Sequence, residues 1–319
     1  MIYLIKKISL LVVLIVLVSS LKAQQELQFT QYMFNQMAFN PGYAGSSGNI
    51  SVTGNLREQW VGFKDMEGEK IAPSSQSITV DAPIDFLHGG AGLTIINDKL
   101  GYEKNIALRF AYAYQFDMFG GQIGVGPQIE LTSRTLDFSK LKPAQAGGDP
   151  VLDGLKEEQA MVFDVGLGAF YKADKFYLGL ALNRLLGSKA SYSDEGVFSN
   201  KMHFYVNGGY DYQLPDYPLY TLQPSFMVKS DGVTTQVDIS CLVKYDNKFW
   251  GGLSYRYQDA IAFLLGLRYK QFQVGYSYDL TTSDISRVGT GGSHEIFVNY
   301  SFNLNFDRIP KSYHNTRFL

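Results

Sequence analysis

The chain has a single cysteine, Cys241, among 319 residues. One thiol cannot form an intrachain disulfide, and it cannot supply the paired cysteines of a zinc-binding motif. Its position, far from the N-terminus, also excludes a lipoprotein, in which the mature chain starts with a lipid-modified cysteine. We interpret Cys241 as a small apolar side chain within an extended segment.

Positive charge is also scarce. Lys and Arg together number 28 against 30 Asp and Glu, which leaves a net charge of −2 and no basic stripe along the chain. Proteins that bind nucleic acid carry such a stripe, since they must neutralise phosphates. Nucleic acid is therefore excluded as an expected partner.

Residues with catalytic or metal-binding spacing are missing too. The four histidines, His88, His203, His294 and His314, form no pair with metal-ligand spacing. Ser293, His294 and Glu295 are consecutive, but neighbouring residues of a strand point to opposite faces and cannot assemble a triad by themselves. Neither glycine-rich run, 89–92 or 289–292, continues into the Lys-Ser/Thr of a phosphate loop. We expect no cofactor, no metal and no enzymatic activity.

The one long apolar run lies at the N-terminus. Lys6 and Lys7 precede an apolar stretch from Ile8 to Val18 that is interrupted only by Ser9, and Ala23 closes a plausible cleavage site before Gln24. The run is shorter than the roughly 20 residues of a membrane-spanning helix. Residues 1–23 are therefore predicted to be a cleaved signal peptide rather than an anchor.

What the sequence does contain is alternation with a period of two. In the segment 292–306, Ile296, Val298, Tyr300 and Phe302 share one face, and the other face is polar except for Phe297. The same separation of faces recurs along the chain, for example in the segment 104–117. In the segment 233–246 it places Val237, Ile239, Val243 and Tyr245 on the apolar face and Asp238, Ser240 and Lys244 on the polar face.

A soluble antiparallel sandwich shows the same period, but these segments are longer than sandwich strands and crowd Tyr and Phe on the apolar face. They predict an all-β fold: an antiparallel transmembrane β-barrel over residues 49–306 with apolar side chains facing lipid. About fourteen strands are expected, with twelve or sixteen as alternatives. Their predicted cores are 49–57, 74–84, 89–97, 104–117, 119–132, 159–172, 174–184, 201–214, 219–230, 233–246, 247–258, 259–270, 271–281 and 292–306.

The connections between these strands alternate in length. The long ones, near 58–73, 133–158, 185–200 and 282–291, are all odd-numbered, and the others are short. Outer-membrane barrels have short periplasmic turns and longer extracellular loops. Both termini, including a C-terminal tail at 307–319, are therefore expected in the periplasm.

Residues 24–48 precede the first strand and are rich in apolar side chains. Phe29, Tyr32, Met33 and Met37 have partly helical spacing, and Pro41 would end such a helix. These side chains are too many to leave solvated beside a membrane pore. We expect a short helix in the periplasmic mouth or inside the barrel as a plug.

Several short motifs together resemble the PorP/SprF family of the type IX secretion system of Bacteroidetes. They begin with Gln28-Phe29-Thr30-Gln31-Tyr32-Met33-Phe34-Asn35 and Asn40-Pro41-Gly42-Tyr43-Ala44-Gly45, and continue with Arg57-Glu58-Gln59-Trp60-Val61-Gly62, Asp81-Ala82-Pro83, Trp250-Gly251-Gly252, Tyr255-Arg256, Tyr278-Asp279 with Ser283, and Gly292-Ser293-His294-Glu295-Ile296. Gly42 stands where the family pattern has alanine. The resemblance spans nearly the whole mature chain.

The resemblance implies a Gram-negative outer-membrane accessory, not an enzyme. It would help to secrete or anchor a cargo protein, such as a gliding adhesin, through the cargo's C-terminal sorting domain. Expected partners are that cargo, the periplasmic ring or other components of the secretion machine, and outer-membrane lipid. A passive or fatty-acid-type channel is the alternative, and an outer-membrane hydrolase a more distant one.

The candidate residues for a partner-binding or structural network lie mainly in the family-like motifs. Several of them can form charge-assisted hydrogen bonds. The candidates are Tyr32, Asn40, Pro41, Gly45, Arg57, Trp60, Arg256, His294 and Glu295. The alternative is ordinary decoration of the lumen and rim. Arg109 and Arg268 also fall on predicted lumen faces.

Overall fold

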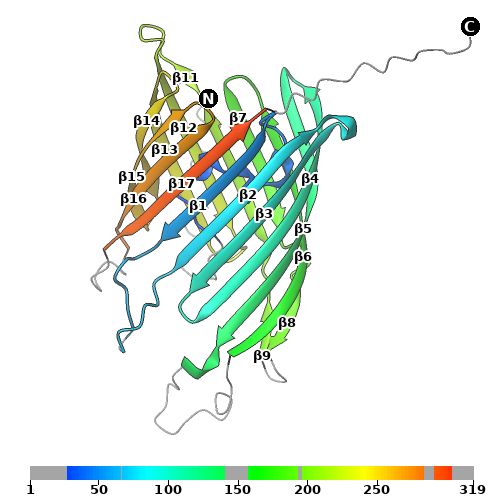
Figure 1. The fold of residues 1–319 in the computed structure, drawn as a ribbon, viewed down its shortest axis with the longest axis vertical. Coiled ribbons are helices and arrows are strands. Elements are labelled where there is room, and N and C mark those ends of the chain that lie inside the picture. Colours follow the sequence, from blue (N-terminus) through cyan, green and yellow to red (C-terminus); the bar gives the residue numbers. More distant parts are fainter. Residues whose placement is uncertain (1–26, 66, 141–156, 193–195, 284–290, 304–319) are drawn as a thin grey trace, which may run out of the picture.

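The structure is a computed structural model that describes residues 27–65, 67–140, 157–192, 196–283 and 291–303. The predicted signal peptide and the predicted tail at 307–319 lie outside these residues. Fourteen antiparallel strands close into a barrel, because β1 pairs with β17 and β10 pairs with β12 (Figure 1). The prediction of an antiparallel barrel of about fourteen strands is confirmed.

The barrel strands follow the predicted segments closely. They are β1 (Ile50–Glu58), β2 (Ser74–Ile84), β3 (Gly89–Leu100), β4 (Glu103–Met118), β5 (Gly121–Asp137), β6 (Glu157–Lys172), β7 (Phe176–Asn183), β10 (His203–Tyr210), β12 (Tyr220–Ser230), β13 (Thr235–Tyr245), β14 (Phe249–Arg256), β15 (Ala260–Tyr269), β16 (Phe272–Thr281) and β17 (Ser293–Phe302). The two-residue β11 (Tyr212–Gln213) also pairs with β12. A separate hairpin, β8 (Lys189–Tyr192) with β9 (Gly196–Ser199), lies in the connection between β7 and β10.

Side chains alternate between the outer surface and the lumen, as the period of two predicts. On β4, Phe110 is exposed on the outer surface, whereas Arg109 and Ala111 are buried. On β13, Ile239 and Val243 are exposed, and Asp238 and Ser240 are buried. The apolar outer surface suits contact with lipid. A closed barrel can lie in lipid because all its strands pair their backbone groups with neighbouring strands.

The two ends of the barrel differ. We call the end with the connections β1–β2, β5–β6, β7–β10 and β16–β17 the loop end, and the opposite end the turn end. Connections at the turn end include residues 119–120 and 270–271. The first residue of β1 and the last residue of β17 pair at the turn end, Ile50 opposite Phe302.

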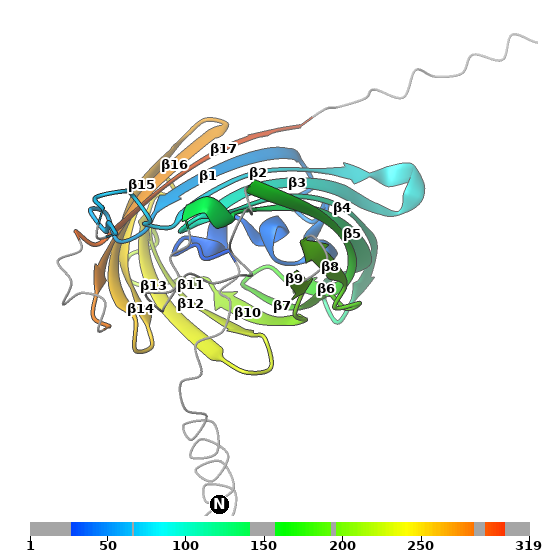
Figure 2. The same ribbon diagram turned by 90° about the horizontal axis from the view of Figure 1, so that it is seen from below.

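The N-terminal residues 27–48, here called the lumen segment, lie inside the barrel. Figure 2 shows this segment surrounded by the ring of strands. It contains three one-turn 3-10 helices, η1 (Tyr32–Phe34), η2 (Gln36–Ala38) and η3 (Pro41–Tyr43). Two more lie elsewhere, η4 (Asp85–Leu87) and η5 (Phe138–Lys140). None of the helices in the described ranges is long and apolar enough to cross a membrane.

The single helix expected before Pro41 is therefore replaced by separate turns. Asn35 interrupts the helical path, since its backbone adopts φ −135° and ψ 69°. Its side chain instead donates to Asn55 of β1 at 2.7 Å and accepts from Thr79 of β2 at 3.0 Å. Hydrogen bonds to the barrel wall thus override the local helical spacing, as tertiary contacts commonly do.

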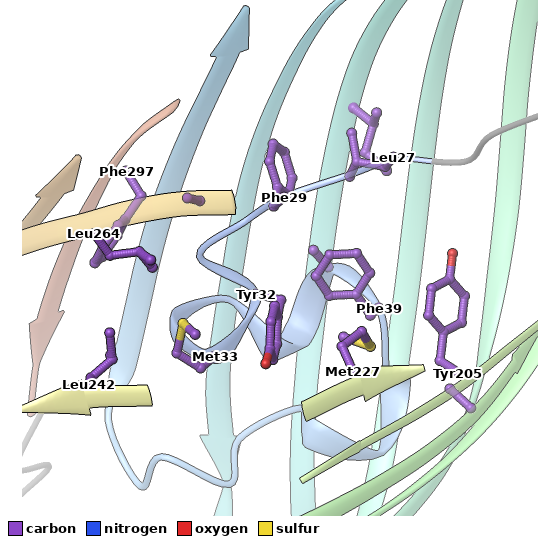
Figure 3. Packing of buried hydrophobic residues seen from close by; sticks show 14 of the residues in the cluster. Leu27, Phe29, Tyr32, Met33, Phe39, Tyr205, Met227, Leu242, Leu264 and Phe297 are labelled. Atoms are coloured by element: carbon purple, nitrogen blue, oxygen red, sulfur yellow. The ribbon is translucent and has the colours of Figure 1, made fainter. Parts of the chain in front are cut away.

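The apolar core of the molecule is inside the barrel, between the lumen segment and the wall (Figure 3). Phe34 stacks on Phe297 of β17, with ring centroids 4.8 Å apart, and lies 5.0 Å from the ring of Trp250 of β14. Phe297 is the large apolar residue that breaks the polar face of its strand, and it is fully buried. The irregularity in the pattern therefore marks a contact with the lumen segment.

The assignment of faces on β13 predicts opposite labelling of two cysteines. Cys241 is exposed on the outer surface, and Lys244 faces the lumen. In proteoliposomes, native Cys241 should react with an apolar maleimide and resist a charged one, because lipid covers it. In a Cys241→Ser background, Lys244→Cys should react with the charged reagent. The reverse pattern, with both sites reactive after denaturation, would show that the faces are exchanged.

Candidate functional site: a charged cluster between the lumen segment and the wall

Five charged side chains from five strands meet inside the barrel near the loop end. Arg57 on β1 bonds Asp279 on β16 at 2.7 Å and Glu295 on β17 at 3.1 Å. Arg256 on β14 bonds Asp238 on β13 at 2.8 Å and the same Asp279 at 3.0 Å. All five side chains are at most 4% exposed. We call these residues the charged cluster.

Strand register creates much of this cluster. Arg57 lies directly opposite Glu295 in the pairing of β1 with β17, and Asp238 lies directly opposite Arg256 in the pairing of β13 with β14. Residues opposite each other in an antiparallel pair have their Cβ atoms within about 5.5 Å, so unlike charges there attract. The shared carboxylate of Asp279 joins the two pairs.

Thr30 of the lumen segment lies at the centre of the charged cluster. Its backbone N–H donates to Glu295 Oε2 at 2.7 Å, and the N–H of Gln31 donates to Glu295 Oε1 at 2.9 Å. Its hydroxyl donates to Asp279 Oδ2 at 2.8 Å and accepts from both arginines, at 2.8 and 3.0 Å. Charge-assisted hydrogen bonds of this kind are among the stronger ones in proteins. The cluster thus clamps the start of the lumen segment to the wall.

A second polar contact holds the middle of the lumen segment. Arg109 on β4 donates to the carbonyl of Ala38 at 3.0 Å and bonds Glu130 on β5 at 2.7 Å. Arg184 bonds the same carboxylate at 2.9 Å, and Asn183 donates to the carbonyl of Phe39 at 3.0 Å. These contacts satisfy backbone groups that would otherwise be buried without partners.

The last part of the lumen segment approaches the turn end. The Asn40 side chain accepts from the Gly42 N–H and donates to the Ala169 carbonyl, each at 2.9 Å, and so caps η3, in which Pro41 is the first residue. Gly45 has φ +74° and donates to Asp81 at 3.2 Å. A side chain at Gly42 would lie 2.8–2.9 Å from wall backbone atoms, which explains glycine where the family pattern has alanine.

The candidate residues therefore fall into three groups. Arg57, Arg256 and Glu295 meet in the charged cluster, and Tyr32 lies beside it, with its hydroxyl 3.2 Å from those of Ser225 and Ser240. Asn40, Pro41 and Gly45 bind the wall nearer the turn end.

Trp60 and His294 are not part of the charged cluster. Trp60 lies in the β1–β2 loop, where its ring contacts Phe63. His294 has its Nδ1 atom 2.7 Å from the Tyr276 hydroxyl. It points away from the charged cluster, because neighbouring residues of β17 face opposite sides and Glu295 faces the lumen.

Three central residues were not among the candidates: Thr30, Asp238 and Asp279. Thr30 and Asp279 stand within the family-like motifs, but neither residue type is distinctive there. For Asp238, the sequence predicts only that its side chain faces the lumen. Their convergence depends on strand register and on the path of the lumen segment.

The loop end is itself ordered by polar contacts. In the β1–β2 loop, Asp65 accepts hydrogen bonds from the Tyr102 hydroxyl and from the N–H groups of Glu67 and Glu69. The Tyr102 hydroxyl, and after it these backbone donors, hold the pKa of Asp65 below its usual value. The same hydrogen bond raises the pKa of Tyr102 to about 12.

The fold and the charged cluster define a class of protein: an outer-membrane β-barrel whose lumen is occupied by its own N-terminal segment. The family model described as "Type IX secretion system membrane protein PorP/SprF" matches residues 21–300. The chain belongs to this family, and the resemblance expected from its motifs is confirmed. A search of curated protein sequences found no match.

Among solved structures, the chain is similar to other barrels at low identity. A mutant of the TodX monoaromatic hydrocarbon channel is 13% identical, with a TM-score of 0.46 and coverage of 80% of this chain and 90% of that one. A Pseudomonas aeruginosa FadL homologue is 11% identical, with a TM-score of 0.41 and the same coverage. Acinetobacter baumannii Omp33 is 8% identical, with a TM-score of 0.43 and coverage of 80% and 98%. Likeness at this level says nothing about what this chain transports or binds.

Proposed function

We propose that this barrel is a non-enzymatic accessory of the type IX secretion system. It binds a cognate cell-surface protein, such as a gliding adhesin, through that protein's C-terminal sorting domain and helps to secrete or anchor it. Family membership supports a role in this system. The choice of a protein-binding role over a channel is carried by one observation, the lumen segment packed across the interior of the barrel.

A passive channel needs a continuous passage that solutes can cross. Here the lumen segment is fastened to the wall by the charged cluster near the loop end and by further contacts down to Lys172, which donates to the Ser46 carbonyl at 3.0 Å near the turn end. Several of these contacts are hydrogen bonds between the segment and charged side chains, each of which typically contributes about 1.5 to 3 kcal/mol, so displacing the segment would lose several such contributions together. A segment bound to the wall at both ends is unlike a gate that moves to admit small solutes. Its fixed position supports a role in binding a protein partner.

The expected orientation places the turn end in the periplasm and the loop end outside. Ile50 and Phe302, the two ends of the barrel sheet, then both lie on the periplasmic side. The start of the lumen segment lies nearer the loop end: Gln28 accepts from Gln59, just beyond the last residue of β1. This differs from the expectation that both termini lie in the periplasm. We propose that the mature chain begins near Gln24 and that its start lies on the outer side, because Gln28 contacts Gln59 near the loop end.

Epitope tags at two sites should report this arrangement on intact cells. A tag inserted directly before Leu27 should bind antibody without permeabilisation, because the neighbouring Gln28 lies towards the loop end. A tag inserted directly after Asn303 should bind only after permeabilisation of the outer membrane. Binding in the opposite order would reverse the orientation of the barrel, and protection of both tags would place the N-terminus on the periplasmic side.

The proposed function is tested by deleting the gene and comparing the surface proteomes of the deletion strain and the complemented strain. We expect one or a few proteins with a C-terminal sorting domain to disappear from the surface and to return on complementation. Complementation with Lys248→Gln should work equally well, since Lys248 is an exposed residue of a turn. Intact surface proteins together with lost uptake of a fatty acid or other solute would instead identify a channel.

A further inference from the structure

The lumen is not filled completely at the turn end. A cavity of about 600 Å³ remains between the lumen segment and the wall. Met33, Phe34 and Tyr43 of the lumen segment form one side of it, and the inward side chains of several strands form the other. Its size lies within the usual range of ligand pockets, roughly 300–1,000 Å³.

The charged side chains that line the cavity are all cationic. They are Lys172, Lys244, Arg268 and Lys270, and no aspartate or glutamate lines it among the residues described. Lys244 has a carboxylate partner at the rim, Asp211 at 3.2 Å. Within the described residues, the Arg268 guanidinium bonds the neutral Gln273 at 3.1 Å, the Lys270 ammonium lies 5.4 Å from the centroid of the Tyr269 ring, and neither side chain forms an ion pair. Arg268 and Lys270 are exposed at the mouth of the cavity, and positive charge without an acidic partner there attracts anions.

Two buried polar atoms of the lining add hydrogen-bonding capacity. Trp250 is 7% exposed and Gln223 is 8% exposed, and both line the cavity. The indole N–H of Trp250 and the side-chain oxygen of Gln223 have no hydrogen-bond partner among the described residues. Buried polar atoms in proteins nearly always have partners, so these two are suited to a bound molecule with both donors and acceptors.

We propose that this cavity binds an extended acidic peptide segment of the secreted partner. Carboxylates would pair with Arg268 and Lys270, the peptide backbone would bond the Trp250 N–H and the Gln223 oxygen, and apolar side chains would rest on Phe34 and Tyr43. Turn residues and the exposed Phe249 line the mouth of the cavity, and the other lining residues lie deeper in the lumen, so a lipid phosphate would have to leave its leaflet to reach them. The inference rests on the proposed function for the identity of the partner, and charge complementarity selects the chemistry.

Binding is tested with the purified full-length barrel in neutral detergent and a fluorescent hexaglutamate peptide. We expect saturable binding that weakens with added salt, and none with hexaglutamine or hexalysine. Replacing both Arg268 and Lys270 with glutamine should weaken binding roughly tenfold, which corresponds to about 1.4 kcal/mol for the two lost charged contacts together. The matched control is Lys248→Gln. Lys248 lies at the same end of the barrel, pairs with Asp246 and does not line the cavity.

Three outcomes would overturn the proposal: equal binding by the double variant and the parent, equal binding of hexaglutamine, or displacement of the peptide by equimolar inorganic phosphate. The last would indicate a phosphate site. Heat-dependent gel mobility checks that each variant is folded. The proposed function is tested separately by the surface proteome of the deletion strain. An unchanged proteome would contradict the proposed function even if the purified barrel still binds the peptide.

Discussion

Replacing Arg57 with methionine is expected to lower the free energy of unfolding by about 3 to 5 kcal/mol, the usual cost of removing one partner from a buried ion pair. The substitution leaves Glu295 without a cationic partner and Asp279 with only Arg256, in a site where these side chains are at most 4% exposed. It also removes a donor to Thr30. Unfolding by guanidinium in detergent micelles, followed through the fluorescence of Trp60 and Trp250, measures the change.

The control for Arg57 is Lys70→Met. This substitution breaks the ion pair with Glu58 in the neighbouring loop, where the two side chains are 58% and 32% exposed. An exposed pair contributes at most about 1 kcal/mol, so little change is expected. The double variant Arg57→Met with Glu295→Gln should recover part of the loss, because it removes an unpaired charge.

The role of the charged cluster in cargo display is tested with Arg57→Ala and Glu295→Ala. If the cluster positions the lumen segment for a partner, both variants should lose surface display of the cargo as well as heat stability. If both keep parental heat stability and normal display, the cluster is ordinary decoration of the lumen.

Deleting Gln28 to Phe39 is expected to open the barrel. The deleted residues contain η1, η2 and the side chains that pack against Phe297 and Trp250 across the lumen. The charged side chains on the wall then face water, which hydrates them at little cost. The variant should insert into planar bilayers and conduct far more than the parent, or should insert and fail to capture cargo.

The control is Lys248→Gln, which changes an exposed turn residue paired with Asp246 and leaves the lumen segment intact. It should insert with the parental conductance. If the lumen-segment deletion inserts normally, stays closed and still displays its cargo, the segment is neither a plug nor a docking element.

Much of the fold was predictable because it is encoded locally. A period of two in the sequence translates directly into two faces of a strand, and a membrane requires a minimum strand length and a closed sheet. Each strand can therefore be recognised from its own residues. Counting the strands gives the size of the barrel, and the alternation within each strand gives its lipid-facing and lumen-facing sides. The 3-10 turns of the lumen segment were not predictable in this way, because Asn35 bonds to β1 and β2, which follow it in the chain.

The site was predictable only in part. Arg57, Arg256 and Glu295 are candidates because they stand in family-like motifs and can form charge-assisted hydrogen bonds. The sequence does not say that the two arginines share the carboxylate of Asp279. Thr30 and Asp279 are 249 positions apart and are joined by a hydrogen bond. Trp60 and His294 stand in equally prominent motifs and lie outside the cluster, because a loop position and the alternation of β17 turn them away.

The sequence by itself determined the architecture of this protein: a barrel of about fourteen long strands, with greasy and polar faces assigned residue by residue and long loops at one end. These properties depend on neighbours in the chain. Only the tertiary structure decided what fills the barrel, which side chains fasten it, and that the lumen segment runs from the loop end towards a basic cavity at the turn end. Those features depend on ring closure, which brings the first and last strands together and places one buried threonine among charges from across the chain.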